Sequence, residues 1–161
     1  MIRLAGAALL LLAAVLIPRE FSRYAARRLS TEEGILGLFL FLRRELSCFS
    51  RPVGQALGDF RNEALAVTGF PEALRQTEDM AGAAERTVAR MPLSEDFRAL
   101  FLSFADSFGK GYREEEVRRL DAYAGEAQHL LATERRRLPA VRRLVSTLSV
   151  SVCLGLLLLF L

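Results

Sequence analysis

The sequence predicts an all-α protein in which a small helical bundle lies between an N-terminal and a C-terminal transmembrane helix. Residues 1–17 contain one charged side chain, Arg3, and residues 144–161 contain none. An α-helix needs about 20 apolar residues to cross the hydrocarbon core of a bilayer. The 161-residue chain is 25% charged overall, so the charge is concentrated between the two apolar runs. This middle part is long enough for one small domain.

These observations divide the chain into three parts. We expect a transmembrane anchor at 1–18, a helical domain with basic flanks at 19–138, and a second anchor at 139–161. The protein is then a cell-membrane protein with two spans.

Arginines cluster on the inner side of both apolar runs and predict the topology. Short cationic segments beside a span stay in the cytoplasm, where anionic lipids attract them. The middle domain is therefore expected in the cytoplasm and both termini outside, with membrane lipids as partners. A nucleic-acid interface is disfavoured because no aromatic or Gly-rich recognition motif accompanies the arginines. The membrane-flanking residues are Arg19, Arg23, Arg27, Arg28, Arg135, Arg136, Arg137, Arg142 and Arg143.

The first apolar run has an alternative interpretation as a secretory signal peptide, since Leu4–Ile17 has the length of an h-region. Small residues should follow such a region, whereas Pro18 and Arg19 come next. An uncleaved anchor is favoured. The alternative stays open, and it would make the protein an exported, tail-anchored binding protein or enzyme.

The sequence of the first half of the middle domain predicts three helices. Ser30 and Glu33 have the spacing of a capping box and predict a helix start. The residues that follow, up to Phe49, are apolar almost all round, as in a buried core helix. Further helices are expected at 53–67 and 72–90, separated by the Gly-Phe-Pro sequence at 69–71.

The second half predicts two more helices. Ser94 begins the first, whose apolar stripe has 3- and 4-residue spacing. Gly109 and Gly111 provide a turn. A helical pattern then runs from Tyr112 to the chain end, with Pro139 as a kink or break. The stripe of the first helix is Phe97, Leu100, Phe101, Phe104 and Phe108, and that of the second is Val117, Leu120, Ala124, Ala127, Leu131 and Leu138.

Residues for catalysis are scarce, and the sequence predicts no enzyme, no cofactor and no metal. His129 is the only histidine, and Glu126 precedes it with Glu-x-x-His spacing. Di-metal bundles need two such motifs and further glutamates. Cys48 has no partner at metal-ligand spacing and is expected to be a buried thiol. No phosphate-loop, dinucleotide or nucleophile-elbow motif occurs.

The charged side of residues 113–137 is the candidate partner-docking surface. Its residues are Arg113, Glu114, Arg118 and Glu126. An ordinary solvated helix face explains the same pattern, and this alternative stays open.

The chain resembles the stage III sporulation protein AB family over its whole length. Phe104–Gly109, followed by a long polar helix and the C-terminal run, is the most specific segment, and Glu45–Leu57 is also similar to the family pattern. Tyr112 stands where the family has an acid, and Glu116 where it has a glutamine. An Arg-Pro pair usual after the first linker is absent.

The resemblance implies an all-α cytoplasmic domain similar to that of type II secretion inner-membrane platform proteins. It also implies a non-enzymatic scaffold subunit of a secretion-like complex at the boundary between mother cell and forespore, with the middle domain on the mother-cell side. Its partners would be other membrane subunits and a cytoplasmic secretion-type ATPase. A free-standing membrane regulator remains a third hypothesis.

Overall fold

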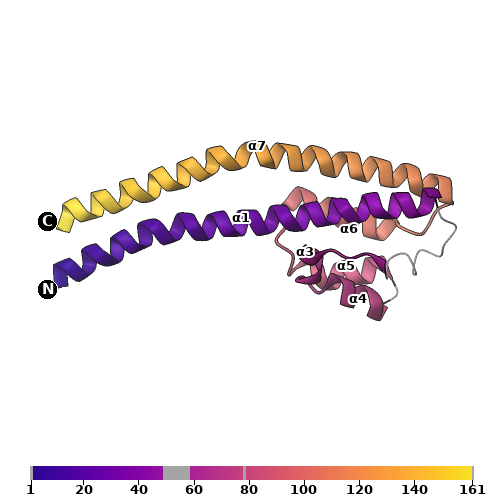
Figure 1. Ribbon diagram of the computed structural model, residues 1–161, viewed down its shortest axis with the longest axis horizontal. Helices are drawn as coiled ribbons and strands as arrows, with labels where there is room; N and C mark the ends of the chain where they lie inside the picture. The colour runs from indigo at the N-terminus through magenta and orange to yellow at the C-terminus, as the bar shows by residue number, and fades with distance from the viewer. Residues whose placement is uncertain (1, 49–58, 78, 161) are drawn as a thin grey trace. The chain divides into compact units, whose positions relative to one another are not determined.

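Every element in the described part of the chain is an α-helix, as predicted (Figure 1). The computed structural model describes residues 2–48, 59–77 and 79–160, without the side chains of 2–15, 17, 142, 153 and 156–160. The helices are α1 (Ile2–Cys48), α3 (Glu63–Ala66), α4 (Phe70–Thr77), α5 (Met80–Val88), α6 (Glu95–Ser107) and α7 (Arg113–Phe160).

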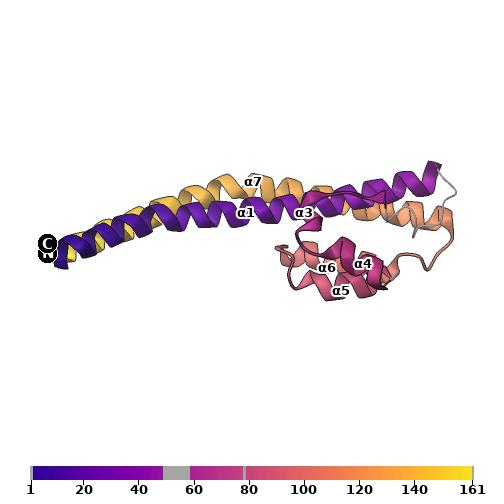
Figure 2. The same ribbon diagram turned by 60° about the horizontal axis from the view of Figure 1, so that its bottom comes forward.

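The chain forms two compact units, and the two long helices contribute to both. The first unit comprises Met1–Ala26 and Thr133–Leu161, and the second comprises Arg27–Ala132. Within the first unit the α1 and α7 segments run side by side in opposite directions, with the chain termini at the same end (Figures 1 and 2). The second unit holds the helical domain with its hydrophobic core.

The described residues contain no helix with a stretch both long enough and apolar enough to cross a membrane. The two apolar runs at 1–17 and 144–161 lie partly outside the described side chains. The predicted anchors therefore stay predictions.

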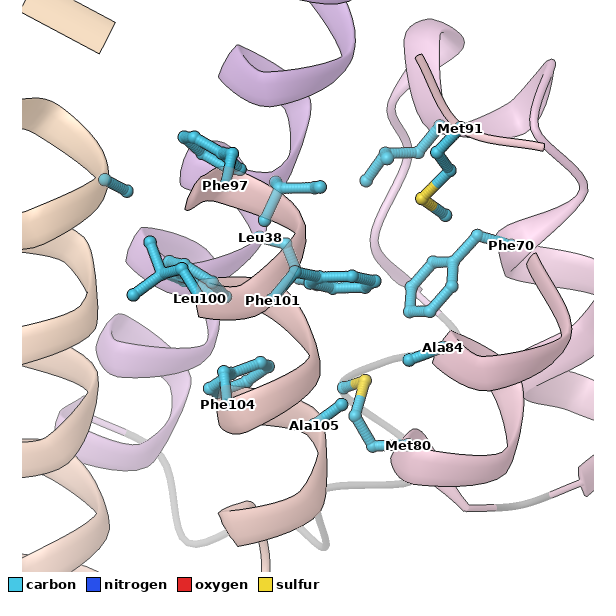
Figure 3. Close-up of a cluster of buried hydrophobic side chains, with 14 of the residues drawn as sticks. Leu38, Phe70, Met80, Ala84, Met91, Phe97, Leu100, Phe101, Phe104 and Ala105 are labelled. Atoms are coloured by element: carbon cyan, nitrogen blue, oxygen red, sulfur yellow. The ribbon is translucent and has the colours of Figure 1, made fainter. Parts of the chain in front are cut away.

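The core of the second unit is built around α6, which packs against α1 and α7 on one side and against α4 and α5 on the other. The stripe predicted for α6 is confirmed for Phe97, Leu100, Phe101 and Phe104, which are all buried. Phe108, its fifth predicted member, follows the end of α6 and is only partly buried. Phe101 points toward Phe70 of α4 (Figure 3), with ring centroids 5.5 Å apart. The remaining large contributors are Ile35, Leu38, Phe39 and Leu42 of α1, Leu65 of α3, Met80 of α5, Met91 and Leu93 of the following loop, and Leu120 and Leu131 of α7.

Aromatic rings join α6 to the two long helices. The Phe104 ring centroid lies 4.5 Å from that of Phe39 on α1 and 5.5 Å from that of Tyr123 on α7. The Tyr123 hydroxyl lies 3.1 Å from the hydroxyls of Ser103 and Ser107 on α6. The polar end of this partly buried tyrosine is thus hydrogen-bonded while its ring packs against the core.

The predicted helix start at Ser30 is wrong, because α1 runs without interruption from Ile2 to Cys48. A capping residue starts a helix only where the preceding backbone leaves the helical conformation. Here the hydroxyl of Thr31 donates to the carbonyl of Arg27 at 3.0 Å, four residues earlier, as in a helix interior. Pro18 and Pro139 likewise lie inside α1 and α7, so Pro139 does not end the last helix.

The predicted helix at 72–90 is divided in two. Asp79 has an extended backbone and caps α5, accepting from the amides of Ala81 and Gly82 at 3.3 and 3.1 Å. Gly69, with φ of +78°, precedes α4, and such a conformation favours glycine. The predicted helix at 53–67 is wrong in its described part, because residues 60–62 are not helical and Asn62 has an extended backbone that caps the four-residue α3. Residues 53–58 of this prediction lie outside the described residues.

Buried Glu32 of α1 holds the start of α6. The predicted start of α6 is confirmed, with Ser94 as N-cap, but the Ser94 side chain makes no capping hydrogen bond. Instead the Ser94 amide donates to Oε1 of Glu32 at 2.8 Å. A carboxylate at a helix N-terminus also interacts favourably with the helix dipole. A long-range contact thus replaces the local cap.

Candidate docking surface

The four predicted docking residues are all exposed on the part of α7 that belongs to the second unit. Glu114 and Arg118 are four residues apart and so share one face of the helix. Glu126 lies two turns beyond Arg118. None of these three forms an ion pair with another described residue. Their charges are available to solvent or to a partner.

Arg113 differs from the other three because its guanidinium is already engaged. Its Nε donates to the carbonyl of Leu46, and its Nη2 donates to the carbonyl of Ser47 at 3.2 Å. These carbonyls belong to the last turn of α1, where no intrahelical partners exist. Arg113 therefore links the start of α7 to the end of α1, a structural role that its sequence position did not reveal.

A shallow depression of about 600 Å³ surrounds Glu114 and Arg118. Tyr112 forms one wall and is 86% exposed. Arg119 forms another and is paired with Glu115. The complete lining is Tyr112, Glu114, Glu115, Arg118, Arg119 and Ala122. Tyrosine and arginine are enriched at protein interfaces relative to the rest of the protein surface.

Buried Glu116 fixes the loop that carries Tyr112. Its Oε1 accepts from the amide of Gly111 at 2.9 Å, and Arg119 Nη1 lies 3.7 Å from the same oxygen. Gly109, with φ of +84°, reverses the chain just before. The predicted turn between α6 and α7 is confirmed, and it places Tyr112 on the surface at the start of α7.

The membrane-flanking arginines are mostly solvent-exposed. Arg28 is half-buried, with its Nε 3.9 Å from Oε1 of Glu32, and the side chain of Arg142 lies outside the described residues. Arg23 pairs with Glu20 at 3.1 Å. The exposed members are Arg19, Arg23, Arg27, Arg135, Arg136, Arg137 and Arg143.

The described residues contain no group of three or more side chains that could hold a metal ion. His129 and Glu126 are both exposed. The expectation of a buried Cys48 is wrong, since this thiol is exposed at the end of α1. The lack of a partner at metal-ligand spacing does not by itself make a cysteine part of the core.

No curated protein and no solved structure matches the chain. The sequence model of one family, described as stage III sporulation protein AB, matches residues 3–161. The match includes the helical core, the charged face of α7 and both terminal apolar runs. The chain therefore belongs to the stage III sporulation protein AB family.

Proposed function

We propose that the protein is a non-enzymatic platform subunit of a secretion-like membrane complex that acts in sporulation at the boundary between mother cell and forespore. The observation that carries this proposal is the family match over residues 3–161. The terminal apolar runs insert in the membrane, and the helical domain faces the mother-cell cytoplasm. Other membrane subunits bind there, together with a cytoplasmic secretion-type ATPase.

Membrane anchoring is supported by the sequence of the two terminal runs. Residues 144–161 form an uncharged stretch of about the length that a bilayer requires. Both runs carry arginines on the side that leads into the domain, which favours a cytoplasmic domain. One apolar run precedes the domain and the other follows it. If each run spans the membrane once, the whole domain lies on one side of the membrane.

The continuity of α1 favours a retained N-terminal anchor over a cleaved signal peptide. A leader is followed by a cleavage site rich in small residues, whereas here the helix continues from the apolar run through Arg19 and Arg23 into the core. We predict that the intact mass of the purified protein equals that of the full chain. Loss of about 20 to 26 N-terminal residues, the length of a typical leader, would favour the exported alternative.

The exposed face around Glu114 and Arg118 is the proposed docking surface. It offers unpaired charge and an exposed aromatic ring, and nearby Glu116 holds it in place through the Gly111 amide. Complementary charges on a partner make binding to such a surface specific for that partner. Arg113, by contrast, is not part of the docking surface, because its guanidinium is hydrogen-bonded to carbonyls at the end of α1.

We predict that Arg118→Glu lowers recovery of partner subunits about tenfold when the full chain is crosslinked and captured from sporulating cells. Reversal of a charge at an interface costs at least about 1.4 kcal/mol, which corresponds to a factor of ten. Arg86→Glu is the matched control, since Arg86 is an exposed arginine of α5 and the net charge changes equally.

Two results would contradict the account. Equal recovery with both variants would show that this face of α7 is not the docking surface. Recovery of no other membrane subunit with the unmodified chain would overturn the platform function and favour a free-standing membrane regulator.

A further inference from the structure

The first unit contains a pocket of about 460 Å³ between its two helical segments. Its lining is Pro18, Arg19, Ser22, Arg23 and Ala26 of α1 and Ser146 of α7. Every one of these residues belongs to the first unit, so the pocket does not depend on the helical domain. Its volume is in the range of small-molecule sites.

The lining offers hydrogen-bond donors and positive charge. Arg19 has no ion pair within the described part of the chain, and the hydroxyls of Ser22 and Ser146 make no hydrogen bond to other described residues. Arg23 is paired with Glu20, but both side chains are exposed, at 59% and 67%. Such exposed pairs are weak and exchange readily for another anion.

The pocket therefore has two guanidinium groups and one carboxylate nearby, which leaves an excess of positive charge. A guanidinium presents its donors in a planar fork that fits phosphate oxygens. Serine hydroxyls can donate to the remaining oxygens. A phosphate group matches this set of donors.

The place of the pocket along the helices indicates the source of that phosphate. Pro18 directly follows the apolar run at 1–17, and Ser146 is the third residue of the run at 144–161. The two segments are antiparallel (Figure 2), and both line the pocket. The two apolar runs therefore end at the same level, next to the pocket.

We infer that this pocket binds the phosphate headgroup of an anionic phospholipid. The acyl chains lie along the apolar runs while the guanidinium groups of Arg19 and Arg23 hold the phosphate at the cytoplasmic interface. This inference rests on the proposed membrane anchoring. It adds a defined lipid site to the general attraction of arginines to an anionic surface.

The test is native mass spectrometry of the full chain in a mild detergent, titrated separately with phosphatidylglycerol, phosphatidylcholine and glycerol phosphate. We expect one phosphatidylglycerol to bind at least tenfold more tightly than phosphatidylcholine. Arg19→Gln combined with Arg23→Gln should abolish this preference. The matched control, Arg136→Gln combined with Arg137→Gln, removes the same charge outside the pocket and should preserve it.

The inference is overturned if both double variants behave alike, or if phosphatidylglycerol binds no better than phosphatidylcholine. Glycerol phosphate binding as tightly as the lipid would assign the site to a soluble phosphate and would also overturn it. Alkaline extraction of membranes tests the anchoring separately. If the unmodified chain is extracted, the proposed membrane function fails, whereas an anchored chain without lipid preference refutes only the headgroup site.

Discussion

Replacement of Phe104 by alanine is expected to lower the free energy of unfolding by about 3–5 kcal/mol, the usual range for a buried phenylalanine. Phe104 is 1% exposed, and its ring contacts Phe39, Tyr123 and Phe108. Alanine leaves a cavity where α1, α6 and α7 meet. Aromatic pairs add about 0.5–1.5 kcal/mol beyond buried area, so the loss should fall in the upper part of that range.

Urea unfolding of the full chain in detergent, followed by the near-ultraviolet circular dichroism of tyrosine, measures this loss. Tyr123 reports on the core because it touches Phe104, whereas Tyr24 and Tyr112 are 56% and 86% exposed. Leu40→Ala is the control, at a position of α1 that is 41% exposed. It should cost less than about 1 kcal/mol, as expected near a surface. Equal losses at Phe104 and Leu40 would contradict the assigned core.

Replacement of Glu32 by alanine is expected to cost about 2 kcal/mol, because the Ser94 amide at the start of α6 loses its acceptor. An unsatisfied buried group costs about 1–3 kcal/mol. Part of this loss is offset, since Glu32 is fully buried and its Oε2 has no hydrogen-bond partner among the described residues. A buried carboxylate oxygen that accepts no hydrogen bond carries a desolvation cost, although Arg28 Nε lies 3.9 Å from Oε1 of the same carboxylate.

Glu32→Gln separates the hydrogen bond from the charge. The glutamine keeps an oxygen that can accept from Ser94, so its loss of stability should be less than half that of the alanine variant in the same urea assay. Glu85→Ala is the control, at an exposed glutamate of α5, and should remain within about 0.5 kcal/mol of the unmodified chain. A Glu32→Ala variant as stable as this control would show that the contact does not hold α6.

Local sequence patterns correctly predicted those helices and turns that depend only on residues close together in the sequence. The stripe from Phe97 to Phe104 needed only helical periodicity, and the turn after α6 needed only the glycines at 109 and 111. The start at Ser30 was wrong because a local capping signal competes with the helical propensity of the residues before it. The division between α4 and α5 depended on the Asp79 side chain, whose capping role is hard to distinguish from that of an exposed helix residue.

The candidate sites depended more on tertiary structure. Glu114 and Arg118 are exposed as their polar positions predicted. Tyr112 joins them only because the turn held by Glu116 places it on the surface. Arg19 and Arg23 were expected to face lipid headgroups. That Ser146 lines the same pocket could not be predicted, because it depends on how two segments more than a hundred residues apart align side by side.

Cysteine labelling can show whether the chain is anchored at both ends with its domain in the cytoplasm. Of the two cysteines, Cys48 is exposed and Cys153 lies in the C-terminal apolar run. A Cys153→Ser variant should react with a membrane-impermeant maleimide in inverted vesicles and not in intact protoplasts. A Cys48→Ser variant should react in neither, because its remaining thiol lies within the bilayer. Labelling of Cys48 in intact protoplasts would contradict the account.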